Sequence, residues 1–93
     1  MEYTQMTLTE WVDMKQKLRQ ELLGVKQSFV RIGYVLRKID DQKLYEQDGY
    51  KSVAEFAKAE YGLEGSTVSR FMAINREYSI DGYSERLRSE YLD

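Results

Sequence analysis

Three hydroxyl side chains and one guanidinium group occur within five residues, in the run Ser66-Thr67-Val68-Ser69-Arg70. Hydroxyl groups can bond phosphate oxygens and base edges, and an arginine can form two parallel hydrogen bonds with O6 and N7 of guanine. Ser66 and Ser69 have no base to activate them, which makes nucleophilic catalysis unexpected, and the absence of histidine excludes His-based acid–base catalysis. The run therefore favours nucleic-acid contact over catalysis, and we expect the protein not to be an enzyme.

These residues are predicted to open the second of two short helices. Ser52 is a suitable N-cap with Glu55 three residues later, which is a capping box and predicts a helix over residues 53–61. Gly62 suits the left-handed position that ends such a helix, and a second helix is predicted over 65–76. Apolar residues are predicted to line the inner side of the pair, namely Val53, Phe56, Ala57, Tyr61, Leu63, Val68, Phe71, Met72 and Ile74. This layout over 53–76 is that of a helix-turn-helix, whose second helix enters the DNA major groove.

Eight polar residues are the candidate DNA-binding set. The start of the second helix would present Ser66, Thr67, Ser69 and Arg70 to the bases. The rim would contact phosphates through Lys51, Ser52, Lys58 and Arg76. The structural alternative is a helical hairpin that only packs, since such hairpins recur in many helical proteins.

A long N-terminal helix is predicted over residues 9–42, with Thr9 as its N-cap. Its apolar residues recur at steps of three or four, as one helix face requires. They are Trp11, Met14, Leu18, Leu22, Val25, Phe29, Ile32, Leu36 and Ile39. At about 1.5 Å per residue the helix would span about 50 Å, more than the width of so small a domain. We therefore expect it to project beyond the fold or to pair with a second copy.

Gly24 leaves two interpretations of this segment. A break there would fold the segment into a hairpin, whereas the apolar stripe keeps its phase across Gly24 and favours one continuous or kinked helix. The predicted fold class is all-α, with the long helix packed on the helix-turn-helix and a short C-terminal helix or tail. We expect a flexible N-terminus over 1–8, a helical domain over 9–78 and a tail over 79–93. No helix-ending signal precedes Asp93, so we expect the chain to be part of a longer protein.

Composition excludes several classes of site. The chain has no cysteine and no histidine, which excludes disulfides and the usual zinc sites, and we expect no cofactor and no metal. No apolar run approaches the roughly 20 residues needed to cross a bilayer, and the polar, acidic N-terminus does not resemble a signal peptide. We expect a cytoplasmic protein with neither a membrane nor a small-molecule substrate as its partner.

The net charge of −2 is unevenly distributed. Residues 8–43 carry eight Lys or Arg against five Asp or Glu, and residues 51–76 carry four against three. Residues 77–93 carry two against five. A weakly basic body with an acidic tail is compatible with nucleic-acid binding, but it does not predict tight non-specific binding.

The run from Gly62 to Phe71 resembles the turn and recognition helix of prokaryotic helix-turn-helix domains, including those of ParB-like partition proteins. Those families commonly have Gly-Leu-Ser, a basic residue, and then Ser-Thr-Val-Ser-Arg. The wider block from Phe29 to Asn75 resembles uncharacterised proteins of Gram-positive mobile elements and phages that are thought to bind DNA. The chain departs from the pattern at Glu64, where the family has a serine, and at Gly65, where it has a basic residue.

The resemblance and the residues together predict sequence-specific binding of double-stranded DNA, in transcription regulation, partition or transfer of a mobile element. A homodimer through the 9–42 helix would suit a two-fold symmetric operator. The alternative is a helical protein–protein interaction or dimerisation module without DNA binding, in which the 9–42 stripe is the working surface.

Tyrosine side chains allow one more interpretation, in which rings stack on the bases of single-stranded nucleic acid. The candidates are Tyr34, Tyr45, Tyr50, Tyr61 and Tyr78. Tyrosines at helix edges more often bury the ring and keep the hydroxyl group in water. That packing role is therefore favoured for them, and for Trp11 as an anchor within the domain or at a subunit contact.

Overall fold

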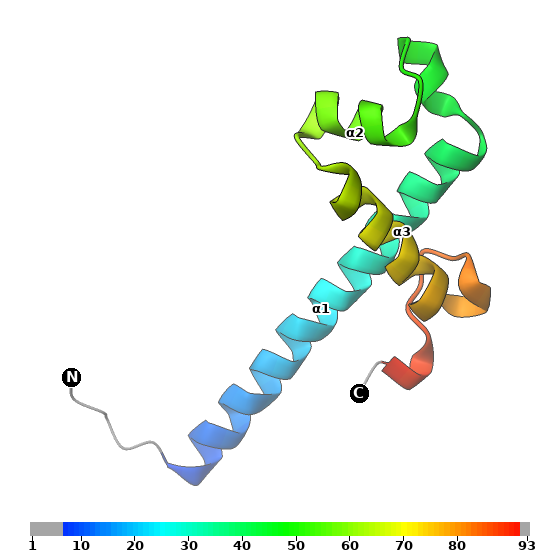
Figure 1. Cartoon of the computed structure of the whole chain (residues 1–93). Coiled ribbons are helices and arrows are strands. Elements are labelled where there is room, and N and C mark those ends of the chain that lie inside the picture. Colours follow the sequence, from blue (N-terminus) through cyan, green and yellow to red (C-terminus); the bar gives the residue numbers. More distant parts are fainter. Residues whose placement is uncertain (1–6, 92–93) are drawn as a thin grey trace.

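The computed structural model describes residues 7–91, and its longest element is the helix α1, Leu8–Asp41 (Figure 1). A capping box begins α1: the Thr7 hydroxyl group accepts from the Glu10 amide, and the Glu10 carboxylate accepts from the Thr7 amide. The prediction of Thr9 as the N-cap was therefore wrong. Thr7 has a glutamate three residues later, whereas Thr9 is followed at that spacing by Val12, which cannot bond back. The expectation of flexibility over residues 1–6 lies outside the described residues.

The helix α1 runs without a break through Gly24, as the phase of the apolar stripe predicted. A Cβ atom added at Gly24 would have no neighbouring atom within 4 Å. Nothing in the surrounding structure therefore requires a glycine there. The all-α fold class is confirmed, because the described residues contain three α-helices, short 3-10 turns and no strand beyond one isolated bridge.

The predicted helical pair is present as α2, Val53–Tyr61, and α3, Gly65–Tyr78. The Ser52 hydroxyl group caps α2 by accepting from the Glu55 amide, while the Glu55 carboxylate accepts from the Lys51 amide instead of the Ser52 amide. Gly62 ends α2 in the left-handed conformation, with φ of 71°. The helix α3 extends two residues beyond its predicted end at residue 76.

A short turn connects α1 to α2. It is the 3-10 helix η1, Leu44–Asp48, and the two residues that flank it, Lys43 and Gly49, are both left-handed. This turn places Tyr45 in a small core between α1, α2 and α3, where the buried side chains are Leu36, Tyr45, Val53, Ala57 and Val68. Of the predicted inner side chains, Phe56, Leu63, Phe71 and Met72 are half-buried against this core. Tyr61 was wrongly predicted to face inward, because 69% of it is exposed.

The helix α3 crosses α1 at Gly33 (Figure 1). A Cβ atom on Gly33 would lie 2.9 Å from the carbonyl carbon of Phe71 and 2.8 Å from Cβ of Asn75. Only glycine permits backbones to approach so closely. The buried face of α1 is therefore centred on Val30, Gly33 and Leu36.

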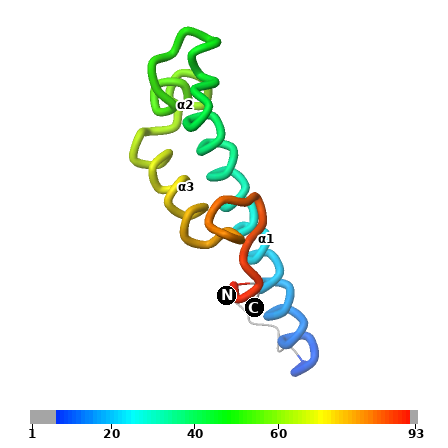
Figure 2. The backbone as a smooth tube through the Cα atoms, turned by 90° about the vertical axis from the view of Figure 1, so that its right-hand side faces the viewer, coloured from blue at the N-terminus to red at the C-terminus, as the bar shows by residue number. Residues whose placement is uncertain are grey.

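The predicted stripe on α1 packs against the rest of the fold only near its C-terminal end. Every residue from Leu8 to Leu22 is exposed, and this half of α1 extends away from the other elements (Figure 2). The long helix therefore packs on the helical pair and also projects beyond the fold, as its predicted length indicated, because α2 and α3 are too short to cover a 34-residue helix. We call residues 30–91 the head and residues 8–29 the α1 arm.

The tail after α3 is folded back onto α1 and α3. The 3-10 turn η2, Ile80–Gly82, reverses the chain, and Ser79 then pairs with Leu87 in an antiparallel bridge. Leu87 is buried. The 3-10 turn η3, Ser89–Tyr91, follows, and so the C-terminal segment is a packed tail without an α-helix among its described residues.

Candidate nucleic-acid interface

One continuous stripe of α3 faces away from the core. Its exposed positions are Ser66, Ser69, Arg70, Ala73, Arg76 and Glu77. They recur at steps of three or four and therefore lie on one helix side, over about 15 Å between residues 66 and 76. The stripe carries small side chains and two arginines, so it combines close approach with positive charge.

Four of the predicted contact residues lie on or beside this stripe. Ser66, Ser69 and Arg70 are exposed, whereas Thr67, which was predicted to be on the outer surface, is half-buried beside the stripe. Arg70 forms no ion pair or side-chain hydrogen bond within residues 7–91. Within this range the donors of its guanidinium group are therefore unengaged.

The N-terminus of α3 has Glu64 as its N-cap, and the Glu64 side chain makes no capping hydrogen bond. Instead the carboxylate pairs with the ammonium group of Lys58 on α2. Both side chains are more than half exposed, so this pair contributes little to stability. Its consequence is electrostatic, because the charge of Lys58 is offset and Glu64 is neutralised where it would otherwise repel a phosphate.

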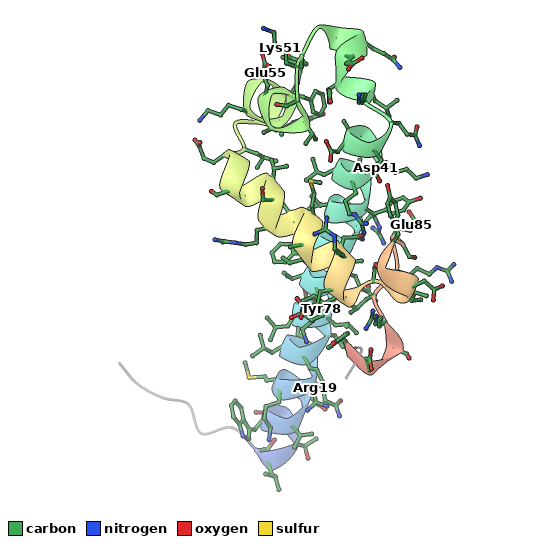
Figure 3. The ribbon with its side chains drawn as sticks, turned by 45° about the vertical axis from the view of Figure 1, so that its right-hand side comes forward. Arg19, Asp41, Lys51, Glu55, Tyr78 and Glu85 are labelled. Atoms are coloured by element: carbon green, nitrogen blue, oxygen red, sulfur yellow. The ribbon has the colours of Figure 1, made fainter. Side chains whose placement is uncertain are left out.

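The other predicted rim residues are spread over both helices. Lys51 is exposed just before α2, close to Glu55 (Figure 3). Ser52 is half-buried and its hydroxyl group caps α2, as predicted, so the side chain assigned to a phosphate contact already stabilises the start of a helix. Arg76 is exposed in the last turn of α3 and lies on the same stripe as Arg70.

Asn75 holds α3 in place from the opposite side. Its side chain is fully buried, and Nδ2 donates to the backbone oxygens of Val30 and Ser84, at 2.7 Å each. Oδ1 accepts from the Arg37 guanidinium group at 3.0 Å. One amide therefore joins α3, α1 and the tail. Sequence reasoning missed this residue, although a polar side chain four residues after Phe71 in the inward phase of α3 was the available signal.

Arg37 extends this network into the tail. Its guanidinium group also donates to the Gly82 carbonyl oxygen at 2.5 Å and lies 4.0 Å from the centre of the Tyr83 ring. The Tyr83 hydroxyl group donates to the Asp41 carboxylate at 2.6 Å. Burial, followed by this bond to Asp41, raises the pKa of Tyr83 to about 12. This network has a structural role. It fixes the tail and α3 on α1 and does not involve the outward stripe of α3.

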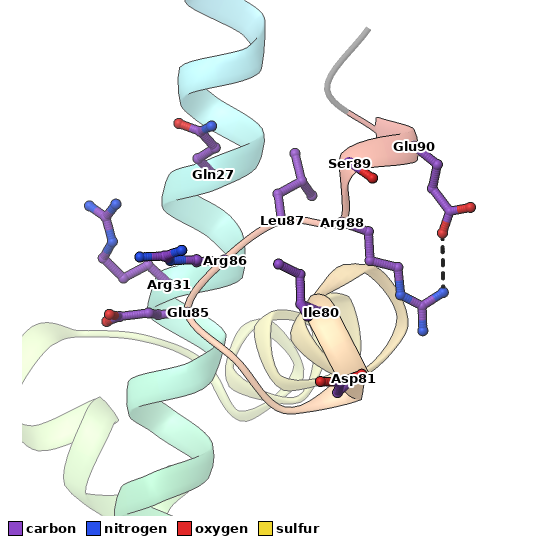
Figure 4. A pocket seen from close by; sticks show the side chains of 10 residues that line it. All are labelled: Gln27, Arg31, Ile80, Asp81, Glu85, Arg86, Leu87, Arg88, Ser89 and Glu90. Carbon is purple, nitrogen blue, oxygen red and sulfur yellow. Dashed lines mark hydrogen bonds and ion pairs between the residues drawn. The ribbon is translucent and has the colours of Figure 1, made fainter.

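A separate cleft lies between α1 and the tail (Figure 4). Arg31 and Arg86 border it together with Glu85, and an ion pair between Arg88 and Glu90 lies on its far side. Charges of both signs line this cleft. Among residues 7–91 no group of acidic side chains is arranged to hold a metal ion.

The tyrosine rings are used mainly in packing. Tyr45 is buried, and edge-to-face contacts join Tyr34 to Tyr83, Tyr50 to Phe56 and Tyr78 to Tyr91. Tyr61 contacts Phe56 in the same way but remains largely exposed. Of the five candidate rings, only that of Tyr61 is therefore largely exposed.

Comparisons with known proteins found no matching family model, curated protein or solved structure. A search of the described helices for a segment with the length and apolar character of a membrane span found none.

Proposed function

We propose that this protein binds double-stranded DNA in a sequence-specific manner, with α3 lying in the major groove. The observation that carries the proposal is the outward stripe of α3, where Ser66, Ser69, Arg70 and Arg76 are exposed on one side of a helix anchored from behind. A recognition helix needs this division between an anchored inner side and a polar outer side.

The roles within the stripe follow from reach and chemistry. Arg70 is assigned to a guanine, because its five donors are unused within the described residues and a bidentate pair with O6 and N7 is the commonest specific contact. Ser66 and Ser69 are assigned to base edges or phosphates at the leading end of α3. Arg76 and Lys51 are assigned to phosphates on either side, while Lys58 contributes less because Glu64 offsets its charge.

We infer that this DNA binding serves transcription regulation, partition or transfer of a mobile element. We further propose a homodimer through α1, because the α1 arm exposes apolar side chains that the head does not cover. The same surface supports the second candidate function, a protein-interaction module that does not bind DNA.

A selection from duplexes with a randomised central region, followed by titration of the enriched duplex by fluorescence anisotropy, tests the proposal. Arg70→Ala should weaken binding to the selected duplex by about 1–3 kcal/mol and relax the preference at one base pair. Arg70→Lys keeps the charge but loses the two-pronged geometry, so it should retain non-specific binding and lose the preference.

The matched control is Lys17→Ala, which removes one positive charge from the exposed outer side of the α1 arm. It should leave discrimination between selected and random duplexes unchanged. If no sequence is enriched, or if Arg70→Ala and Lys17→Ala behave alike at low salt, then α3 is not a recognition helix and the interaction-module function replaces it.

A further inference from the structure

The α1 arm and the first turn of the head carry an apolar seam. Its members are Leu8, Trp11, Leu18, Leu22, Val25, Phe29 and Ile32, which are between 39% and 79% exposed. A run of large apolar side chains along one exposed helix is costly in water, and such surfaces usually mark an interaction site.

The seam follows a seven-residue repeat. The first position of each heptad holds Leu8, Lys15, Leu22 and Phe29, and the fourth holds Trp11, Leu18, Val25 and Ile32. The outer positions of the first two heptads are all polar, namely Thr9, Glu10, Asp13, Gln16, Lys17 and Gln20. A strict repeat of 3.5 residues is typical of a coiled-coil seam, whereas a helix that packs within a globular domain needs only the 3.6-residue period.

The seam is turned only partly away from the face of α1 that the head covers. With about 100° of rotation per residue, the mean direction of the seam lies roughly 45° from that of the buried residues Val30, Gly33 and Leu36. At the junction with the head, the Phe29 ring meets the Phe71 ring edge to face, with 5.4 Å between their centres, yet Phe29 and Ile32 each keep 39% of their surface exposed. A partner helix can therefore lie along the seam of the α1 arm as far as this junction.

Charges beside the seam select the orientation of that partner. The charged residues at the flanking positions are Glu21 on one side of the seam and Arg19 and Lys26 on the other, and the uncharged ones are Met14, Ser28 and Val12. In a parallel pair, Glu21 of one copy lies next to Lys26 of the other copy, and this attraction occurs twice. In an antiparallel pair each flanking side faces the same side of the other copy. Arg19 and Lys26 of one copy then face the basic residues of the other copy and repel them.

We propose that residues 8–32 pair with the same segment of a second copy as a parallel, in-register, two-stranded coiled coil. This inference specifies the pairing geometry of the homodimer in the proposed function. It rests on that dimer but not on DNA binding. Lys15 is the one polar residue on the seam, and its ammonium group lies 5.4 Å from the centre of the Trp11 ring. A single lysine at such a position specifies register and oligomeric state while it lowers stability.

Sedimentation equilibrium of the full chain tests the pairing. The wild-type chain should form dimers. Leu22→Lys should raise the dimer dissociation constant by about 100-fold or more, because two leucines leave the interface. Gln20→Lys adds the same charge on the outer side and should change the constant by less than about threefold. Far-UV circular dichroism checks that each variant remains helical. A wild-type chain that is monomeric up to millimolar concentration, or equal dissociation by the two variants, overturns the proposal.

Disulfide cross-linking tests the orientation, since the chain has no cysteine of its own. Trp11→Cys and Val25→Cys, prepared separately, should each cross-link two copies under mild oxidation, and Gln20→Cys should not. The two seam positions are 14 residues apart, or about 21 Å along the helix. An antiparallel pair can bring at most one of them face to face with its own copy. Cross-linking at only one of the two positions therefore overturns the parallel register.

The two proposals fail separately. Both measurements are made without DNA, so an α3 stripe that does not bind DNA leaves the sedimentation and cross-linking results unchanged. Conversely, a monomeric chain that still selects one duplex sequence contradicts the coiled-coil proposal and supports the assignment of α3 as a recognition helix.

Discussion

The backbone of Phe71 on α3 lies directly against the Cα atom of Gly33 on α1. No side chain separates the two helices at this crossing, and Asn75, one turn further along α3, bonds α1 from the same side. The position of the outward stripe is therefore set by a contact between backbones.

Gly33→Ala should destabilise the fold by about 1–3 kcal/mol, because the added methyl group meets the Phe71 backbone and forces α3 away from α1. The loss should appear although alanine is the better helix former by about 1 kcal/mol. Urea unfolding followed by circular dichroism measures the change. A variant as stable as the wild type would show that the helices cross at a greater distance.

Gly24→Ala is the matched substitution in the same helix, and it should have the opposite sign. A methyl group at Gly24 meets no atom within 4 Å, so only the helix propensity changes, and the variant should be more stable by up to about 1 kcal/mol. The same unfolding experiment measures it. A decrease in stability would indicate that the helix does bend or break at Gly24.

Asn75→Ala should lower the free energy of unfolding by about 3 kcal/mol. The substitution leaves the carbonyl oxygens of Val30 and Ser84 and the Arg37 guanidinium group without their shared, buried partner. Asn75→Asp keeps the shape but loses both donors, and it should cost at least as much. If the aspartate variant is nearly as stable as the wild type, the amide only fills space.

Stability should fall as the pH rises from about 10 to about 12, through Tyr83. The folded chain holds the Tyr83 proton up to a pKa of about 12, while the unfolded chain releases it near 10. In that window the unfolded state binds fewer protons, and the free energy of unfolding decreases with pH. Tyr83→Phe removes this component, so the difference in stability between wild type and variant should shrink across the window. A constant difference would mean that Tyr83 titrates alike in both states.

Glu64→Ser should strengthen DNA binding, because it removes a negative charge at the start of α3 and releases Lys58 from its ion pair. The slope of log K against log salt should steepen by about one as Lys58 becomes available to a phosphate. Glu46→Ser changes the same charge on η1, away from α3, and serves as the control. Equal effects of the two variants would assign the change to net charge alone.

The sequence by itself determined the local elements of this protein. The capping residue Ser52, the left-handed Gly62 and the unbroken phase of apolar residues across Gly24 are signals between near neighbours, and each predicted its element. The exposed positions of α3 followed from the same 3.6-residue period. Thr7 was not predicted as the N-cap because Thr9 also suits that position. Only Thr7 has a glutamate at the correct spacing.

Only the tertiary structure decided which side of α1 is buried, and where. Periodicity marked a single stripe, yet the head packs on Val30 and Gly33 together with Leu36 from the C-terminal part of that stripe, while much of the stripe remains exposed. A glycine that looked like a weak point in a helix is the crossing point, and Asn75 is a buried anchor between three elements. These roles depend on contacts between segments some 40 residues apart in the chain, such as Arg37 and Asn75, and the spacing of neighbouring residues carries no information on such contacts.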